Sequence, residues 1–181
     1  MVFAKPGREN TRETIELALR TAREENIRDI VIATVEGNSP LLLHDTEGLN
    51  IVVVTHSYGY RDTNGNPLRP ENRAEMERRG YTIYTAAHAL SGAERALSAK
   101  FAGVYPVEII AHTLRMFGQG TKVCVEVAAM ACDAGLIRPG DRVIAIGGTV
   151  RGEDTAMILR PGYTHTLLDT KIERYLCKPV V

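Results

Sequence analysis

The chain has 181 residues, of which 44% are hydrophobic, and its 22 Lys and Arg side chains are balanced by 22 Asp and Glu. This length and apolar content fit one domain, residues 1–181, with a buried core. A zero net charge without a stripe of Lys and Arg argues against a nucleic-acid-binding module. The chain has no N-terminal signal-like segment and no apolar run near the roughly 18 residues of a membrane span. We therefore expect a cytoplasmic protein that binds neither nucleic acid nor membrane.

Segments with helical and with β periodicity alternate along the chain. Apolar side chains recur at helical spacing in residues 11–25, whereas residues 51–54 form a continuous β-branched run, typical of a strand covered on both faces. Ser39 followed by Pro40 is typical of a helix start, and residues 91–94 (SGAE) have the pattern of a capping box. In chain order we predict a helix over 11–25, a strand over 29–34, a short helix over 39–48, a strand over 50–55, a loop over 57–70, a helix over 70–80, a strand over 81–85, helices over 91–100, 106–117 and 121–134, and strands over 142–146 and 156–159.

This alternation predicts a three-layer α/β/α sandwich around a mostly parallel sheet. The fifth strand, residues 156–159, follows the fourth too closely for a parallel crossover, which needs a dozen or more residues. We therefore expect it to be an antiparallel edge strand.

The cysteines and histidines give no sign of a metal site or a disulfide framework. The three cysteines are an odd number without a CxxC pair, and the five histidines form no HxH or HxxxH pair. Cys124 and Cys132 lie in an apolar helical run, so we expect them to be buried structural thiols.

Two predicted strands end in turns that favour an anionic ligand. Gly147 and Gly148 directly follow a buried strand, and glycines there let a ligand approach the backbone N–H groups. The turn 34–39 (TVEGNS) ends another strand. Helix directions bring the turn 118–121 to the same carboxyl edge, where ligands bind in such sheets and where helix N-termini favour anions. Neither turn matches GxGxxG or GxxxxGK[ST], which disfavours a dinucleotide or a nucleoside triphosphate.

We therefore predict a crevice for a phosphorylated small molecule at this edge. Tyr58 or Tyr60 is a candidate for stacking on a flat ring, with loop packing as the alternative. His56 and His88 are weak candidates for acid–base catalysis, with loop anchoring as the alternative. The predicted ligand-binding residues are Thr34, Glu36, Gly37, Asn38, Ser39, Thr55, His56, Ser57, Gly118, Gln119, Gly120, Thr121, Gly147, Gly148, Thr149, Asp154 and Thr155.

The chain resembles stand-alone proteins built like the C-terminal domain of pyruvate kinase. The resemblance is carried by residues 34–39, 103–107 and 139–148, and a closer match to a small stand-alone subfamily by residues 54–59, 85–92 and 109–120. It implies a five-stranded sheet of order 3-2-1-4-5 with strand 5 antiparallel. It also implies that pyruvate kinase activity is absent, because that chemistry resides in a barrel domain. The subfamily is associated with flavin mononucleotide (FMN), which would suit the predicted crevice. The chain departs from the family pattern at Glu36, a poor neighbour for a phosphate, and in the short apolar segment 40–44.

Three functions follow as hypotheses. The first is an FMN-binding protein, either a flavin-dependent oxidoreductase or a flavin carrier. The second is a regulatory or sensor module that binds a sugar phosphate or another phosphorylated metabolite without catalysis. The third is a phosphate-ester hydrolase or lyase that uses His56 or His88. We also expect a homo-oligomer, with the apolar tail 176–181 and the edge of the fifth strand as contact surfaces.

Overall fold

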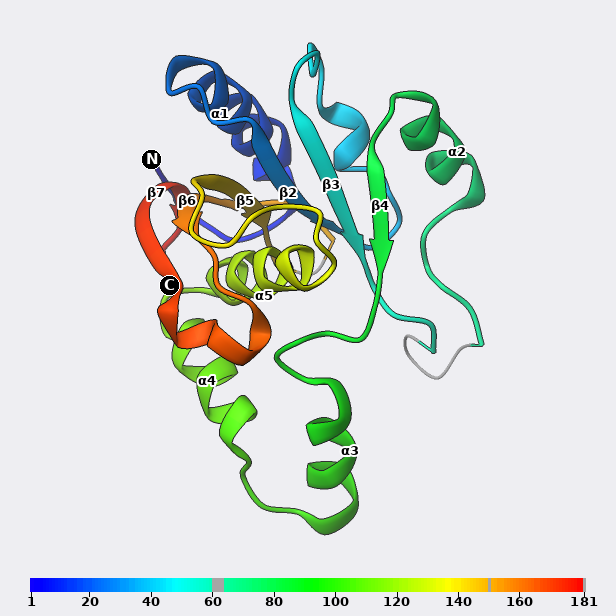
Figure 1. The fold of residues 1–181 in the computed structure, drawn as a ribbon, viewed down its shortest axis with the longest axis vertical. Coiled ribbons are helices and arrows are strands. Elements are labelled where there is room, and N and C mark those ends of the chain that lie inside the picture. Colours follow the sequence, from blue (N-terminus) through cyan, green and yellow to red (C-terminus); the bar gives the residue numbers. More distant parts are fainter. Residues whose placement is uncertain (60–63, 150, 181) are drawn as a thin grey trace.

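A computed structural model of the chain describes residues 1–59, 64–149 and 151–180 (Figure 1). In this part of the chain, seven strands form one mixed sheet of order β1-β7-β6-β5-β2-β3-β4. The strands are β1 (Val2–Phe3), β2 (Asp29–Thr34), β3 (Asn50–Thr55), β4 (Thr82–Thr85), β5 (Val143–Gly147), β6 (Thr155–Arg160) and β7 (Lys171–Pro179). The helices are α1 (Thr11–Glu24), α2 (Pro70–Arg78), α3 (Gly92–Phe101), α4 (Pro106–Arg115) and α5 (Gln119–Asp133), with short 3-10 turns η1 (Arg8–Asn10), η2 (Pro40–Leu42) and η4 (Thr164–Asp169).

The prediction of a five-stranded sheet is wrong, because the sheet continues beyond β6. The five expected strands keep their expected neighbours, and β6 runs antiparallel to β5 as predicted. However, β7 pairs with β6 in antiparallel fashion and β1 adds to β7 in parallel. The first four residues of β7 are polar or exposed, so it lacks the apolar run of a buried strand, and β1 has only two residues.

Helices cover both faces of the sheet, which makes three layers. On one face α1 packs through Ile15 and Leu19 against Ile30 and Ile144 of the central strands. On the other face α5 lies against β5, β2 and β3, and its side of the core includes Val127. Val31 and Val52 pair across β2 and β3 and are fully buried. The centre of the sheet is therefore apolar on both faces, as the β-branched runs predict.

Most predicted boundaries hold to within two residues, whereas one predicted helix and one predicted capping motif are wrong. The strands over 29–34 and 50–55 are confirmed in full. The helix predicted over 39–48 is only the 3-10 turn η2, which has three residues. The capping box predicted at Ser91 is also wrong, because its side chain makes no capping hydrogen bond. In the predicted loop 57–70, residues 60–63 lie outside the described part of the chain, and Tyr60 is among them.

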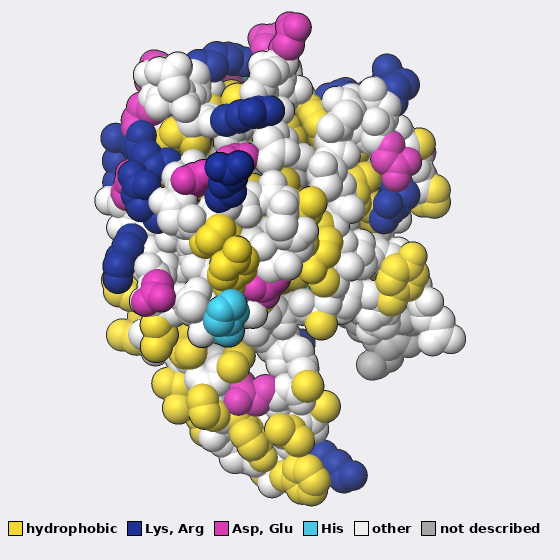
Figure 2. Space-filling model, viewed as in Figure 1, with side chains coloured by type: hydrophobic (Ala, Val, Ile, Leu, Met, Phe, Trp, Pro, Cys, Tyr) yellow, Lys and Arg dark blue, Asp and Glu magenta, His cyan; other side chains and the backbone are white. Residues whose placement is uncertain are grey.

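Helices α3 and α4 project away from the sheet, at the bottom of the view, and carry many exposed apolar side chains (Figures 1 and 2). α3 has no buried residue and α4 buries only Ala111. α4 packs on α5, whereas α3 touches the rest of the fold mainly through α4. The exposed apolar residues of this region are Leu97, Phe101, Val104, Ile109, Met116 and Phe117.

Of the two contact surfaces predicted for a homo-oligomer, the strand edge is wrong and the apolar tail is partly buried. The edge of β6 is paired with β7, and Leu176 and Cys177 of the apolar tail are buried within that pairing. Oligomerisation itself stays a prediction. Among the described residues, no helix is long and apolar enough to cross a membrane.

Candidate functional site

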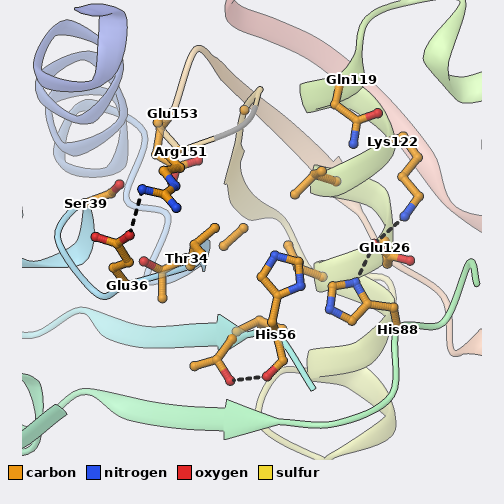
Figure 3. Close-up of a pocket in the computed structure, with 18 of the residues that line it drawn as sticks. Thr34, Glu36, Ser39, His56, His88, Gln119, Lys122, Glu126, Arg151 and Glu153 are labelled. Carbon is orange, nitrogen blue, oxygen red and sulfur yellow. Dashed lines mark hydrogen bonds and ion pairs between the residues drawn. The ribbon is translucent and has the colours of Figure 1, made fainter. Parts of the chain in front are cut away.

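A cleft of about 1150 Å³ opens at the carboxyl ends of β2 and β3 (Figure 3). It lies between two walls. The first, here called the turn wall, comprises residues 34–36, 38 and 39 at the end of β2 and residues 148 and 151–153 between β5 and β6, with the start of α1 beside them. The second, the helix wall, comprises His88 and residues of α3, α4 and α5. Thr11, Gly92 and Gln119 line the cleft, so α1, α3 and α5 all begin there, as the helix directions predict for α5.

The turn wall is held in shape by hydrogen bonds around Gly37. The Gly37 N–H donates to Thr34 Oγ1 at 3.0 Å. Gly37 has a φ of 90°, and a Cβ on it would come within 2.7 Å of the Leu68 side chain, so only glycine fits this turn. Glu36 is paired with Arg69 at 2.9 Å and with Arg151 at 3.1 Å. Its negative charge is therefore compensated within the wall, although the sequence makes it a poor neighbour for a phosphate.

Glu153 is a buried carboxyl group on the same wall. Burial raises its pKa to about 8, against the lowering effect of a side-chain hydrogen bond with Ser39, and the nearby charge of Asp154 raises it further. The Glu153 N–H donates to Thr11 Oγ1 at 3.0 Å, which ties the β5–β6 loop to the start of α1. At neutral pH the Glu153 side chain is therefore mostly a neutral acid and can donate a hydrogen bond.

The centre of the helix wall is the buried carboxylate of Glu126 on α5. Lys122 Nζ lies 2.5 Å from Glu126 Oε2, and the Leu90 N–H donates to Oε1 at 2.9 Å. Burial alone would raise the pKa of Glu126, but the hydrogen bond from His88 and the charge of Lys122 lower it to about 2. Burial lowers the pKa of Lys122, and the charge of Glu126 opposes that effect. Glu126 is thus ionised and fully engaged at neutral pH.

This carboxylate fixes how His88 presents its ring. His88 Nδ1 lies 3.3 Å from Glu126 Oε2, and because Glu126 is ionised, Nδ1 must carry the proton and donate. Nε2 is then the acceptor in the neutral ring. Among the described residues this atom has no hydrogen-bond partner although it is buried. The ring stacks on His56, with centroids 4.9 Å apart.

Two arginines add positive charge to the helix wall. Arg95 of α3 and Arg115 at the end of α4 both line the cleft, and both lie close enough to Lys122 to lower its pKa. Arg115 Nε donates to Gln119 Oε1 at 2.8 Å, which aims its guanidinium from α4 toward the start of α5. The sequence alone gives no sign that these residues of three helices meet.

The structure gathers part of the predicted site at the cleft and leaves the rest away from it. The predicted residues that line the cleft are Thr34, Glu36, Asn38, Ser39, Thr55, His56, Ser57, His88, Gln119 and Gly148. Those that do not are Gly37, Gly118, Gly120, Thr121, Gly147, Thr149, Asp154 and Thr155. Tyr58 is exposed and also lies outside the lining.

Several of the residues outside the lining have packing roles instead. A Cβ on Gly120 would come within 2.1 Å of Thr155 Oγ1, and one on Gly147 within 2.8 Å of Val123, so these glycines let α5 approach the sheet. Asp154 accepts a hydrogen bond from the Gly7 N–H at 3.1 Å and another from Thr155 Oγ1 at 2.8 Å. These contacts fix the start of the chain to the β5–β6 loop.

Sequence reasoning missed most of the charged residues of the cleft, namely Arg8, Arg69, Arg95, Arg115, Lys122, Glu126, Arg151 and Glu153. One signal was available for two of them. Lys122 and Glu126 stand four residues apart in the otherwise apolar run of α5, a spacing that places them on one helix face. Among the described residues, no cluster of three or more His, Cys, Asp and Glu side chains could hold a metal ion.

Comparison with known families agrees with this architecture. The family model described as the pyruvate kinase alpha/beta domain matches residues 12–159, well over half of the chain. The chain belongs to the pyruvate kinase alpha/beta domain family. The match begins at α1 and ends in β6, so it contains all the strands that frame the cleft.

Among solved structures, this pyruvate kinase alpha/beta domain is similar to part of a pyruvate kinase from Cryptosporidium parvum. The sequences are 19% identical, the TM-score is 0.45, and the similarity covers 84% of this chain. It covers only 23% of the enzyme, so the chain spans about a quarter of that protein's length.

Proposed function

We propose that the chain binds a phosphorylated small molecule in the cleft, with FMN as its first candidate ligand. The observation that carries the proposal is the charge of the cleft. Its lining contains the cations Arg8, Arg69, Arg95, Arg115, Lys122 and Arg151 against the carboxyl groups of Glu9, Glu36, Glu126 and Glu153. Glu153 is mostly neutral at pH 7, so cations outnumber anions around a concave site where helices begin, an arrangement that favours a phosphate.

The residues of the cleft are compatible with FMN. The turn wall, with Arg8 and Arg151 at its rim, would hold the phosphate, and the stacked imidazoles of His56 and His88 offer the flat surface for the ring. A cleft of about 1150 Å³ is large enough for a drug-sized ligand, whose pockets run to about 1,000 Å³. Bound FMN would supply electron and hydride transfer, so a flavin-dependent oxidoreductase and a flavin carrier both remain consistent with the site.

A comparison of FMN with riboflavin tests this proposal, because riboflavin has the same ring and lacks the phosphate. We expect FMN fluorescence to be quenched on titration with the protein, and riboflavin to bind at least tenfold more weakly. A ligand of the native state must also raise stability, by about 2.7 kcal/mol at a hundred times Kd. The absence of both quenching and a thermal shift would exclude FMN. A thermal shift with sugar phosphates alone would favour the regulatory or sensor module.

A second candidate, acid–base chemistry on a phosphate ester, is favoured by His88. Its Nδ1 is oriented by an ionised buried carboxylate, and its Nε2 is buried without a hydrogen-bond partner among the described residues. This is the arrangement in which a third group orients a catalytic base. Release of inorganic phosphate from a panel of esters, followed by phosphorus NMR, tests it. Turnover that is absent, or unchanged after His56→Asn and His88→Asn, would eliminate this candidate.

A further inference from the structure

We propose that the helix wall is a second anion-binding subsite, which takes the carboxylate or phosphate group of a second ligand next to the one held by the turn wall. The inference rests on the proposed function for the first occupant and adds a second one. Its basis is the separation of charge between the two walls, which Figure 3 shows facing each other across the cleft.

On the turn wall, Arg151 has a carboxylate partner, because Glu36 pairs with Arg151 at 3.1 Å as well as with Arg69 at 2.9 Å. On the helix wall, Lys122 is paired with Glu126, and that carboxylate is also bonded to His88 and to the Leu90 N–H. Glu126 consequently has little capacity left to balance further cations.

Arg95 and Arg115 are the cations that remain on the helix wall. Among the described residues, neither lies within ion-pair distance of a carboxylate, although both act on the buried Lys122 through their charge. Three cations from three different helices thus converge on the helix wall. Among the described residues that line this wall, Glu126 is the single carboxylate, and it is already paired with Lys122. Arg95 is exposed and Arg115 half-buried, so both guanidinium groups are accessible to an anion that enters the cleft.

The geometry of Arg115 suits an oxyanion. Its Nε is used by Gln119 at 2.8 Å, which fixes the guanidinium plane and leaves the terminal nitrogens to donate. A fixed guanidinium binds planar or tetrahedral oxyanions through paired hydrogen bonds. His88 lines the same cleft. A second ligand held by Arg95 and Arg115 would therefore lie on the His88 side of the cleft, beside the first ligand.

Calorimetric titration of inorganic phosphate and of malonate into the protein saturated with FMN tests this subsite. We expect at least one of the two probes to bind, and the tighter one identifies the group as a phosphate or a carboxylate. The double variant Arg95→Gln/Arg115→Gln should bind that probe at least tenfold more weakly and retain FMN affinity within threefold. The matched control is Arg20→Gln/Arg138→Gln, which removes the same charge from two exposed residues outside the cleft and should change neither affinity by more than twofold.

The outcomes separate this inference from the proposed function. Failure of FMN to bind, with probe binding to the free protein still lost in the Arg95/Arg115 variant, removes FMN and supports the subsite. The subsite is wrong if neither probe binds, or if the two double variants bind the probe equally. Loss of FMN affinity in the Arg95/Arg115 variant, with no probe binding to the FMN-saturated protein, would place the FMN phosphate at the helix wall and also overturn the inference. The single variant Arg115→Lys keeps the charge and should bind the probe more weakly than the wild type but more tightly than the Arg95→Gln/Arg115→Gln variant.

Discussion

Replacement of Glu126 by Gln tests the buried ion pair that organises the helix wall. Gln has the same shape and can still accept the Leu90 N–H, but it leaves Lys122 buried without a counter-charge. Removing one partner of a buried pair typically destabilises a protein by about 3–5 kcal/mol. The pKa of Glu126 gives a similar figure, since a fall from 4.5 to about 2 corresponds to about 3 kcal/mol. We therefore expect Glu126→Gln to lower the free energy of unfolding by about 3 kcal/mol at pH 7.

The pH dependence gives the same prediction an independent check. The folded-state pKa of Glu126 lies below its unfolded value, so its contribution is present above about pH 4.5 and is lost as the pH falls toward about 2. Urea unfolding followed by circular dichroism at pH 7 and pH 3 measures it. The wild type should lose more stability between these pH values than Glu126→Gln does. For a chain of this size, a loss of 3 kcal/mol lowers Tm by about 6–12 °C.

Two further variants isolate the pair itself. Adding Lys122→Met to Glu126→Gln removes the uncompensated buried charge and should restore most of the lost stability. Glu75→Gln on α2 is the matched control, because Glu75 pairs with Arg79 at 2.7 Å on a solvent-exposed surface, where ion pairs contribute little. The reasoning is refuted if Glu126→Gln is no more destabilising than Glu75→Gln, or if the double variant is less stable than Glu126→Gln.

Three more predictions concern the rest of the core and the cleft. Because the pKa of Glu153 is raised to about 8, its favourable contribution is complete below about pH 4.5 and is lost as the pH rises through 8, so Glu153→Gln should flatten the fall of Tm between pH 6 and 9. Gly120→Ala would press its Cβ against Thr155 and should destabilise by about 1–3 kcal/mol, whereas Gly65→Ala, with open space around it, should unfold like the wild type in urea. All three cysteines are buried, and burial raises the pKa of their thiols, so a thiol reagent should label none of them in the native protein and all of them in urea.

The parts of the fold that sequence predicted well are those where periodicity follows burial. The central strands β2 and β3 are buried on both faces, so their apolar runs define them to the residue. β7 was missed because it is polar and exposed along its first half and gains its place by pairing with β6. The capping-box pattern at Ser91 failed because neither side chain caps the helix: Ser91 makes no capping hydrogen bond, and Glu94 accepts the Glu108 N–H instead.

The candidate site was harder to predict than the fold, because its charged residues converge only in three dimensions. Turn glycines attract attention in a sequence, yet Gly147 and Gly120 serve close packing of α5. The charges of the helix wall come from Arg95, Arg115 and Lys122, each on a different helix. No local pattern joins them, and only the short spacing between Lys122 and Glu126 was readable in advance.

Balanced net charge is a weak guide to what such a cleft binds. The equal numbers of basic and acidic residues say nothing about how the charges are paired. Ion pairs on the outer surface, such as Arg142 with Glu25 and Glu173, use acidic residues far from the cleft. Arg95 and Arg115, by contrast, pair with no carboxylate among the described residues and lie where three helices meet the cleft. A chain of zero net charge can therefore present a local positive field to a small anion, and the charge of Glu126 opposes the lowering of the pKa of Lys122 by burial.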